Sequence, residues 1–188
     1  MKPLQAIAMG FVFVVLEAKW PALNGYDAYF DPCGWLLILY GVRGLPDDLR
    51  LRGSVRTLGL LALAASVPLS VPQVVDWLGD TERALAWAAY LPQFGFVALL
   101  FHALSLSAAE AEERRPAMWL RVVVTATLVV MIAPILVFGA GLTGLADPAE
   151  LVRFLVYVMA VWLLFSYSGR PWAGAPPVDE SIGRPKRG

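Results

Sequence analysis

Long apolar segments recur along the whole chain, and they constrain its fold more than any single motif. Of the 188 residues, 59% are hydrophobic and only 16% are charged, whereas soluble domains average about 25% charged residues. A chain this short cannot hide six such segments in a soluble core. The sequence therefore predicts an all-α fold, a polytopic bundle of six transmembrane helices.

The six apolar segments define the predicted spans, and short charged or turn-forming stretches separate them. An aromatic stretch, residues 20–30, joins the first two and suits the headgroup zone of a membrane. Residues 169–188 are rich in glycine, proline and charge and are predicted to form a disordered cytoplasmic tail, so that residues 1–168 make up one domain. The spans are predicted over residues 4–19, 32–46, 57–75, 84–107, 117–141 and 148–168.

The first segment also fits a cleaved signal peptide, since Lys2 precedes an apolar core that ends in Leu16-Glu17-Ala18. A single positive charge and a poor cleavage site favour a retained span. Either interpretation leaves the orientation of the remaining spans unchanged.

The lysine and arginine residues are distributed unevenly between the two sides of the predicted bundle. With the N-terminus inside, 12 of the 15 fall on the inner side and 3 on the outer side. The positive-inside rule then predicts that both termini are cytoplasmic. Arginine outnumbers lysine 12 to 3, a bias associated with bacterial genomes rich in G and C, so the predicted location is the bacterial inner membrane. The inner residues are Lys2, Arg43, Arg50, Arg52, Arg56, Arg114, Arg115, Arg121, Arg170, Arg184, Lys186 and Arg187.

The second span begins with Asp31 as a helix cap and Pro32 at the first helical position. From Pro32 to Gly44 it covers 13 residues, about 20 Å of helix against about 30 Å of hydrocarbon. Either this helix continues further, or its outer end starts below the membrane surface. In the second case Asp31 and Glu17 would lie in the outer leaflet, where ionisable groups are usually functional and Lys19 could pair with them. The simpler interpretation is that Asp31 only caps a helix in the headgroup layer.

Gln93 and His102 are polar residues within the fourth span. A lone histidine there could relay protons, although a hydrogen bond to a neighbouring helix is the commoner role. Together these residues predict a ligand or proton pathway. It would be an outward-opening pocket lined by Asp31, Trp35, Gln93 and Glu17, with His102 deeper. The alternative is a closed bundle without a cavity.

The sequence lacks the motifs of nucleotide-binding, redox and hydrolytic sites. With one histidine and one cysteine it offers no metal or haem centre, and its net charge of zero does not favour nucleic acid. We therefore expect no catalytic residues and no cofactor. The predicted function is a non-enzymatic accessory or scaffold subunit, whose partners are the lipid bilayer and other membrane subunits or a second copy. The alternative is a small transporter or channel using Asp31, Glu17, Gln93 and His102.

The start of the second span also carries a family resemblance. Asp31-Pro32-Cys33-Gly34-Trp35, followed by a short apolar run that ends in a glycine, resembles small polytopic bacterial inner-membrane proteins. The resemblance covers residues 10–45. It implies a multi-span membrane protein and carries no activity.

Overall fold

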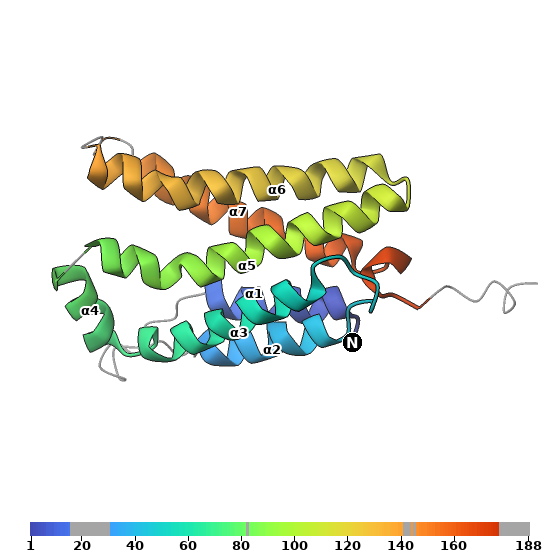
Figure 1. The fold of residues 1–188 in the computed structure, drawn as a ribbon, viewed down its shortest axis with the longest axis horizontal. Coiled ribbons are helices and arrows are strands. Elements are labelled where there is room, and N and C mark those ends of the chain that lie inside the picture. Colours follow the sequence, from blue (N-terminus) through green and yellow to red (C-terminus); the bar gives the residue numbers. More distant parts are fainter. Residues whose placement is uncertain (16–30, 82, 141–143, 145, 177–188) are drawn as a thin grey trace, which may run out of the picture.

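The computed structural model describes residues 1–15, 31–81, 83–140, 144 and 146–176. Within these residues the protein is entirely helical, which confirms the predicted all-α class (Figure 1). The helices are α1 (Pro3–Val15), α2 (Asp31–Arg43), α3 (Arg52–Leu69), α4 (Pro72–Thr81), α5 (Arg83–Glu110), α6 (Arg114–Pro134), the π-helical turn η2 (Ile135–Gly139), α7 (Ala146–Tyr167) and the 3₁₀ turn η4 (Pro171–Ala173).

Helices α1 and α2 form an antiparallel hairpin that small residues allow to close tightly. A Cβ atom on Gly41 would lie 2.7 Å from the carbonyl oxygen of Pro3, so the two backbones touch there. Helix α2 begins at Asp31 and ends at Arg43. It does not continue past Pro46, which leaves it only 13 residues long.

The third predicted span, residues 57–75, is not one straight helix. Helix α3 ends at Leu69, and α4 continues at an angle of 94° to it. Pro72 lacks an N–H group and disfavours the helical conformation of the residue before it, so the chain turns at this point. As a result, most of the stretch predicted as a loop, residues 76–83, lies in α4.

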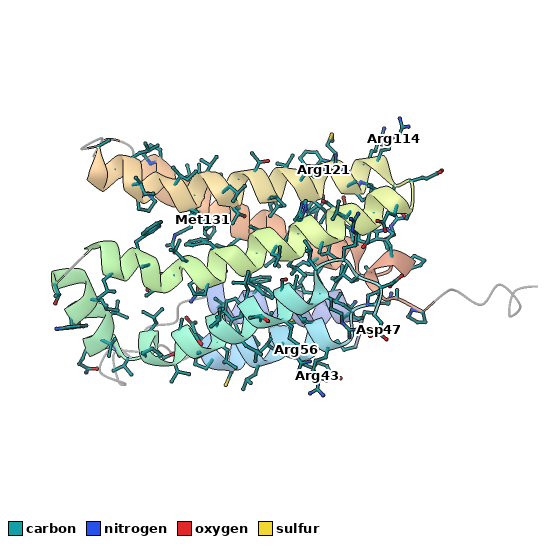
Figure 2. The ribbon with its side chains drawn as sticks, in the orientation of Figure 1. Arg43, Asp47, Arg56, Arg114, Arg121 and Met131 are labelled. Carbon is teal, nitrogen blue, oxygen red and sulfur yellow. The ribbon has the colours of Figure 1, made fainter. Side chains whose placement is uncertain are left out.

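Helices α5 and α6 pack against each other along the bundle (Figure 1). Pro92 lies inside α5 without ending it, whereas Pro134 ends the regular part of α6 and η2 follows. In that region the Trp87 indole N–H donates to the carbonyl oxygen of Met131 at 3.2 Å, and Figure 2 labels this methionine. The bond links the two helices near Pro134, where the regular hydrogen-bond pattern of α6 is interrupted.

The chain after α7 differs from the predicted disordered tail. Residues 170–176 fold back on the bundle, with Ala173 and Ala175 buried and the Trp172 ring 5.9 Å from that of Tyr167. Gly174 has a φ of 83°, and its backbone lies against the carbonyl oxygen of Gly44. Ala173, Ala175 and Trp172 pack this segment against the bundle. Residues 177–188 of the predicted tail lie outside the described residues.

One end of the bundle gathers the N-terminus, the α2–α3 connection, the α5–α6 turn and residues 170–176 (Figure 1). Charge pairs tie these segments together: Arg50 with Glu110 at 3.5 Å, and Arg170 with Glu113 at 3.5 Å. We call this the arginine-rich end. Figure 2 labels four of its arginines, Arg43, Arg56, Arg114 and Arg121. Four more belong to or adjoin the segments gathered there, Arg50, Arg52, Arg115 and Arg170. The other end holds α4 and the start of α5 (Figure 1).

The helices are compatible with a membrane protein. Leu85–Glu110 and Arg114–Val137 are each long and apolar enough to cross a bilayer, and the bent pair α3–α4 would be a third crossing. Two further apolar helices, Pro3–Val15 and Leu151–Tyr167, are shorter.

Candidate functional site

Four aromatic rings fill the bundle where α1, α2, α5 and α7 meet. The centroid of the Trp35 ring lies 5.2 Å from that of the Phe96 ring, in an edge-on arrangement. The Phe11 ring packs against both of these rings and against that of Tyr157, with distances of 6.1 to 6.3 Å between ring centroids. Phe11, Trp35 and Phe96 are 0% exposed. We call these four residues the aromatic layer. Ring pairs of this kind contribute about 0.5–1.5 kcal/mol each beyond the area they bury.

Polar groups lie directly beside the aromatic layer. The Tyr157 phenol interacts electrostatically with Arg153, Asp31 and Tyr90, which come from three different helices. Gln93 lies one turn from Tyr90 and one turn from Phe96, on the same face of α5. The polar cluster therefore consists of Asp31, Tyr90, Gln93, Arg153 and Tyr157. It combines a carboxylate, a guanidinium, two phenols and an amide.

Two hydrogen-bond donors in this region are buried and have no partner among the described residues. They are the indole Nε1 of Trp35 and the amide Nε2 of Gln93, whose residues are 0% and 5% exposed. A buried donor without an acceptor costs about 1–3 kcal/mol. These donors are thus suited to hydrogen-bond an acceptor oxygen that the described residues do not supply. Asp31, Tyr90 and Arg153, by contrast, each already take part in an interaction.

Helix lengths place Asp31, which is partly buried, part-way along the bundle. Helices α2 and α5 run in the same direction, and their rings meet at Trp35 and Phe96 (Figure 1). Trp35 is 4 residues from the start of α2, whereas Phe96 is 13 residues from the start of α5. Helix α5 therefore extends about 14 Å beyond Asp31. Asp31 lies beside the body of α5 rather than at its end.

Three of the residues predicted for the site lie at or near the aromatic layer: Trp35 is part of it, Asp31 begins the same helix, and Gln93 precedes Phe96 by one turn of α5. His102 is not with them, since it is exposed on α5 and nine residues from Gln93, which is half a turn around the helix. Its carbonyl oxygen accepts a hydrogen bond from the Ser105 hydroxyl at 2.7 Å. Glu17, together with Lys19, lies outside the described residues.

Arg153, Tyr157 and Tyr90 belong to the cluster and were not predicted. A signal for the first two was present in the sequence. Arg153 is the one charged residue in the apolar run from Leu151 to Tyr167, and Tyr157 follows one turn later on the same helix face. Tyr90 had no such signal, because tyrosine is ordinary near a membrane interface.

The predicted outward-opening pocket differs from the packing that the structure describes around Trp35 and Gln93. Both side chains are enclosed by neighbours instead of lining a hollow. Hollows in the described surface lie at the arginine-rich end. One of about 1000 Å³ runs along α6 past Arg114 and Arg121, and two smaller ones lie on either side of Arg43.

Comparison with known proteins adds no family to this geometry. No family model, curated protein or solved structure matches the chain. Within the described residues, no group of three or more metal-ligating side chains comes together.

Proposed function

We propose that the chain is a multi-pass protein of the bacterial inner membrane, with six spans and both termini in the cytoplasm. The spans would be α1, α2, α3 with α4, α5, α6 with η2, and α7. The gathering of eight arginines at one end of the bundle supports this orientation, because cytoplasmic loops carry an excess of arginine and lysine.

Within that membrane, we propose a role as a non-enzymatic accessory or scaffold subunit. The aromatic layer carries this proposal. Its rings close the bundle beneath Asp31, with Phe11, Trp35 and Phe96 completely buried. A core packed in this way favours a rigid body that offers its outer faces to partners.

The exposed face of helix α6 is the surface best suited to bind a partner helix. Only 28% of the most apolar 18-residue stretch of α6 is buried, compared with 56% of the corresponding stretch of α5. Its exposed surface carries large apolar side chains along its whole length, Met118, Trp119, Val122, Leu128, Val129 and Ile132. Van der Waals packing of such a face against a second helix is one way in which membrane subunits associate.

Co-purification at native expression tests the scaffold role. A tagged protein extracted in mild detergent should retain a partner in fixed stoichiometry. Leu128→Ala with Ile132→Ala should release that partner. The matched control, Leu155→Ala with Val158→Ala, changes equally exposed residues on α7 and should not. A tagged protein that elutes alone or only as a dimer of itself would contradict this proposal.

A small transporter or channel is the second candidate, and the polar cluster favours it. Asp31 and Arg153 interact with the Tyr157 phenol, near two buried donors that have no partner in the described part of the chain. Ionisable groups on membrane-spanning helices often belong to proton or ion pathways. Proteoliposomes holding a pH-sensitive dye would test this role. Proton flux above that of empty vesicles, lost in Asp31→Asn but kept in the exposed control Glu112→Gln, would favour transport over the scaffold role.

A further inference from the structure

Three arginines from two helices surround a hollow at the arginine-rich end. The hollow has a volume of about 290 Å³ and is lined by Val42, Arg43, Arg52, Gly53 and Arg56. It lies between the last turn of α2 and the first turns of α3, and Figure 2 labels Arg43 and Arg56 close together there. No acidic side chain is among the lining residues.

The three arginines are not equally engaged. Arg52 pairs with Asp47, and its Nη2 donates to the carbonyl oxygen of Arg43 at 3.0 Å, which fixes α2 against α3. Within the described part of the chain, neither Arg43 nor Arg56 pairs with a carboxylate. Two guanidinium groups thus face the hollow with their charges uncompensated, and a guanidinium matches the geometry of phosphate oxygens.

We propose that this hollow binds the phosphate of an anionic phospholipid from the cytoplasmic leaflet. The inference rests on the orientation proposed above, which puts the arginine-rich end at the inner membrane surface. Basic pockets between membrane helices on that side are suited to anionic headgroups. A Cβ on Gly53 would meet nothing within 4 Å, so the headgroup has room to approach the backbone.

The surface beyond the hollow fits acyl chains and so favours a lipid over free phosphate. On α2, Tyr40 and Leu36 lie three and seven residues before Arg43 on the same helix face and are 63% and 57% exposed. On α3, Leu60 follows Arg56 by one turn and is 49% exposed. The volume of 290 Å³ accommodates a headgroup but not the chains. The chains would therefore lie along these two apolar stripes.

Native mass spectrometry of the purified full-length protein in neutral detergent tests the site, with phosphatidylglycerol as the probe. Arg43→Gln and Arg56→Gln should each weaken binding about fivefold, and the double variant about twentyfold or more. Arg115→Gln removes an exposed arginine at the same end that does not line the hollow, and should change affinity less than about twofold. Zwitterionic phosphatidylcholine should bind more weakly than phosphatidylglycerol.

Unchanged phosphatidylglycerol affinity in the folded double variant would overturn the proposal. If the double variant failed to fold, the single lysine variants Arg43→Lys and Arg56→Lys would decide. They keep the charge but lose the paired hydrogen bonds, and binding equal to that of the native protein would also overturn it. Inorganic phosphate that displaced the lipid at millimolar concentration would identify a free-phosphate site and refute a lipid site.

The failure of this inference is distinguishable from failure of the proposed function. Binding in detergent depends neither on orientation nor on partner proteins. A topology reporter that placed residues 44–51 outside would refute the cytoplasmic leaflet as the source of the lipid and leave the detergent result unchanged. A protein without partners would refute only the scaffold role.

Discussion

The carbonyl oxygen of Gly34 lies 2.6 Å from the point that a Cβ atom on Gly10 would occupy. The reverse distance, from a Cβ on Gly34 to the carbonyl oxygen of Gly10, is 2.8 Å. Backbone therefore meets backbone where α1 crosses α2, and neither position has space for a side chain. In a membrane, such close approach of small residues is a main source of helix association.

Gly10→Ala should destabilise the protein by about 1–3 kcal/mol, because an added methyl group must push the hairpin apart. Thermal unfolding in mild detergent measures the loss. Gly79→Ala is the matched control: a Cβ there meets nothing within 4 Å, and the change should be neutral or slightly stabilising. Equal melting temperatures for Gly10→Ala and the native protein would show that the hairpin is not closed in this way.

Gln93→Leu should leave stability unchanged or raise it. The amide Nε2 of Gln93 is buried and has no partner within the residues that the structure describes, and an apolar side chain of similar volume removes that penalty. Ser105→Ala is the contrasting control, since its buried hydroxyl donates to the carbonyl of His102 at 2.7 Å and its loss should cost about 1 kcal/mol. A marked loss of stability in Gln93→Leu would mean that the amide has a partner in solution.

Asp31 and Arg153 should be energetically coupled, since both act on the Tyr157 phenol. A double-mutant cycle with Asp31→Asn and Arg153→Gln should give a coupling energy of about 0.5–3 kcal/mol. Asparagine caps a helix about as well as aspartate, so the cycle isolates the charge. Asp31→Ala should cost about 1 kcal/mol more than Asp31→Asn if Asp31 also caps α2. If the stability effects of the two single variants were simply additive, the charge of Asp31 would not be coupled to Arg153, and Asp31 would serve only at the start of α2.

Removal of residues 170–188 should lower the melting temperature, whereas removal of residues 177–188 alone should not. The longer deletion exposes the surface that Ala173, Ala175 and Trp172 cover. It also removes the pair between Arg170 and Glu113, although an exposed pair contributes little. Stepwise truncation with unfolding in detergent measures the difference. Identical melting curves for the two truncated proteins would show that the packed segment adds no stability.

Topology reporters should read cytoplasmic when fused after Arg56, Arg115 or Arg187. They should read external when placed within residues 76–83 or 143–147. The expectation follows from the 12 to 3 division of basic residues between the two sides. A cytoplasmic signal from residues 76–83 would overturn the six-span arrangement.

Apolar runs and helix-start residues were sufficient to predict the helical class and most helix positions. The Asp31-Pro32 start lies within one residue of the start of α2, and the span predicted over residues 148–168 matches α7 to within two residues at each end. The 94° turn between α3 and α4 was missed. Several prolines occur in these helices, and sequence alone does not tell which one breaks its helix. Pro92 is accommodated within α5, whereas the chain turns at Pro72.

The candidate site could be predicted only in part. Asp31 and Gln93 were identifiable because polar residues are rare in apolar runs. Tyr90 was not, since its role comes from an interaction with Tyr157 on a helix distant in sequence. The exposure of His102 depends on which face of α5 turns inward, and the weak amphipathicity of that helix gave no indication of it.

The unequal helix lengths have a consequence for the surrounding lipid. The 13 residues of α2 rise about 20 Å, whereas the 28 of α5 rise about 42 Å. In the proposed orientation, lipids beside α2 meet an apolar wall shorter than their own hydrocarbon, and this hydrophobic mismatch is confined to one flank. Local thinning of the bilayer would relieve it at a fraction of a kcal/mol per Å. The protein would then sort toward thinner membrane regions, or turn its short flank toward a neighbour with the same mismatch.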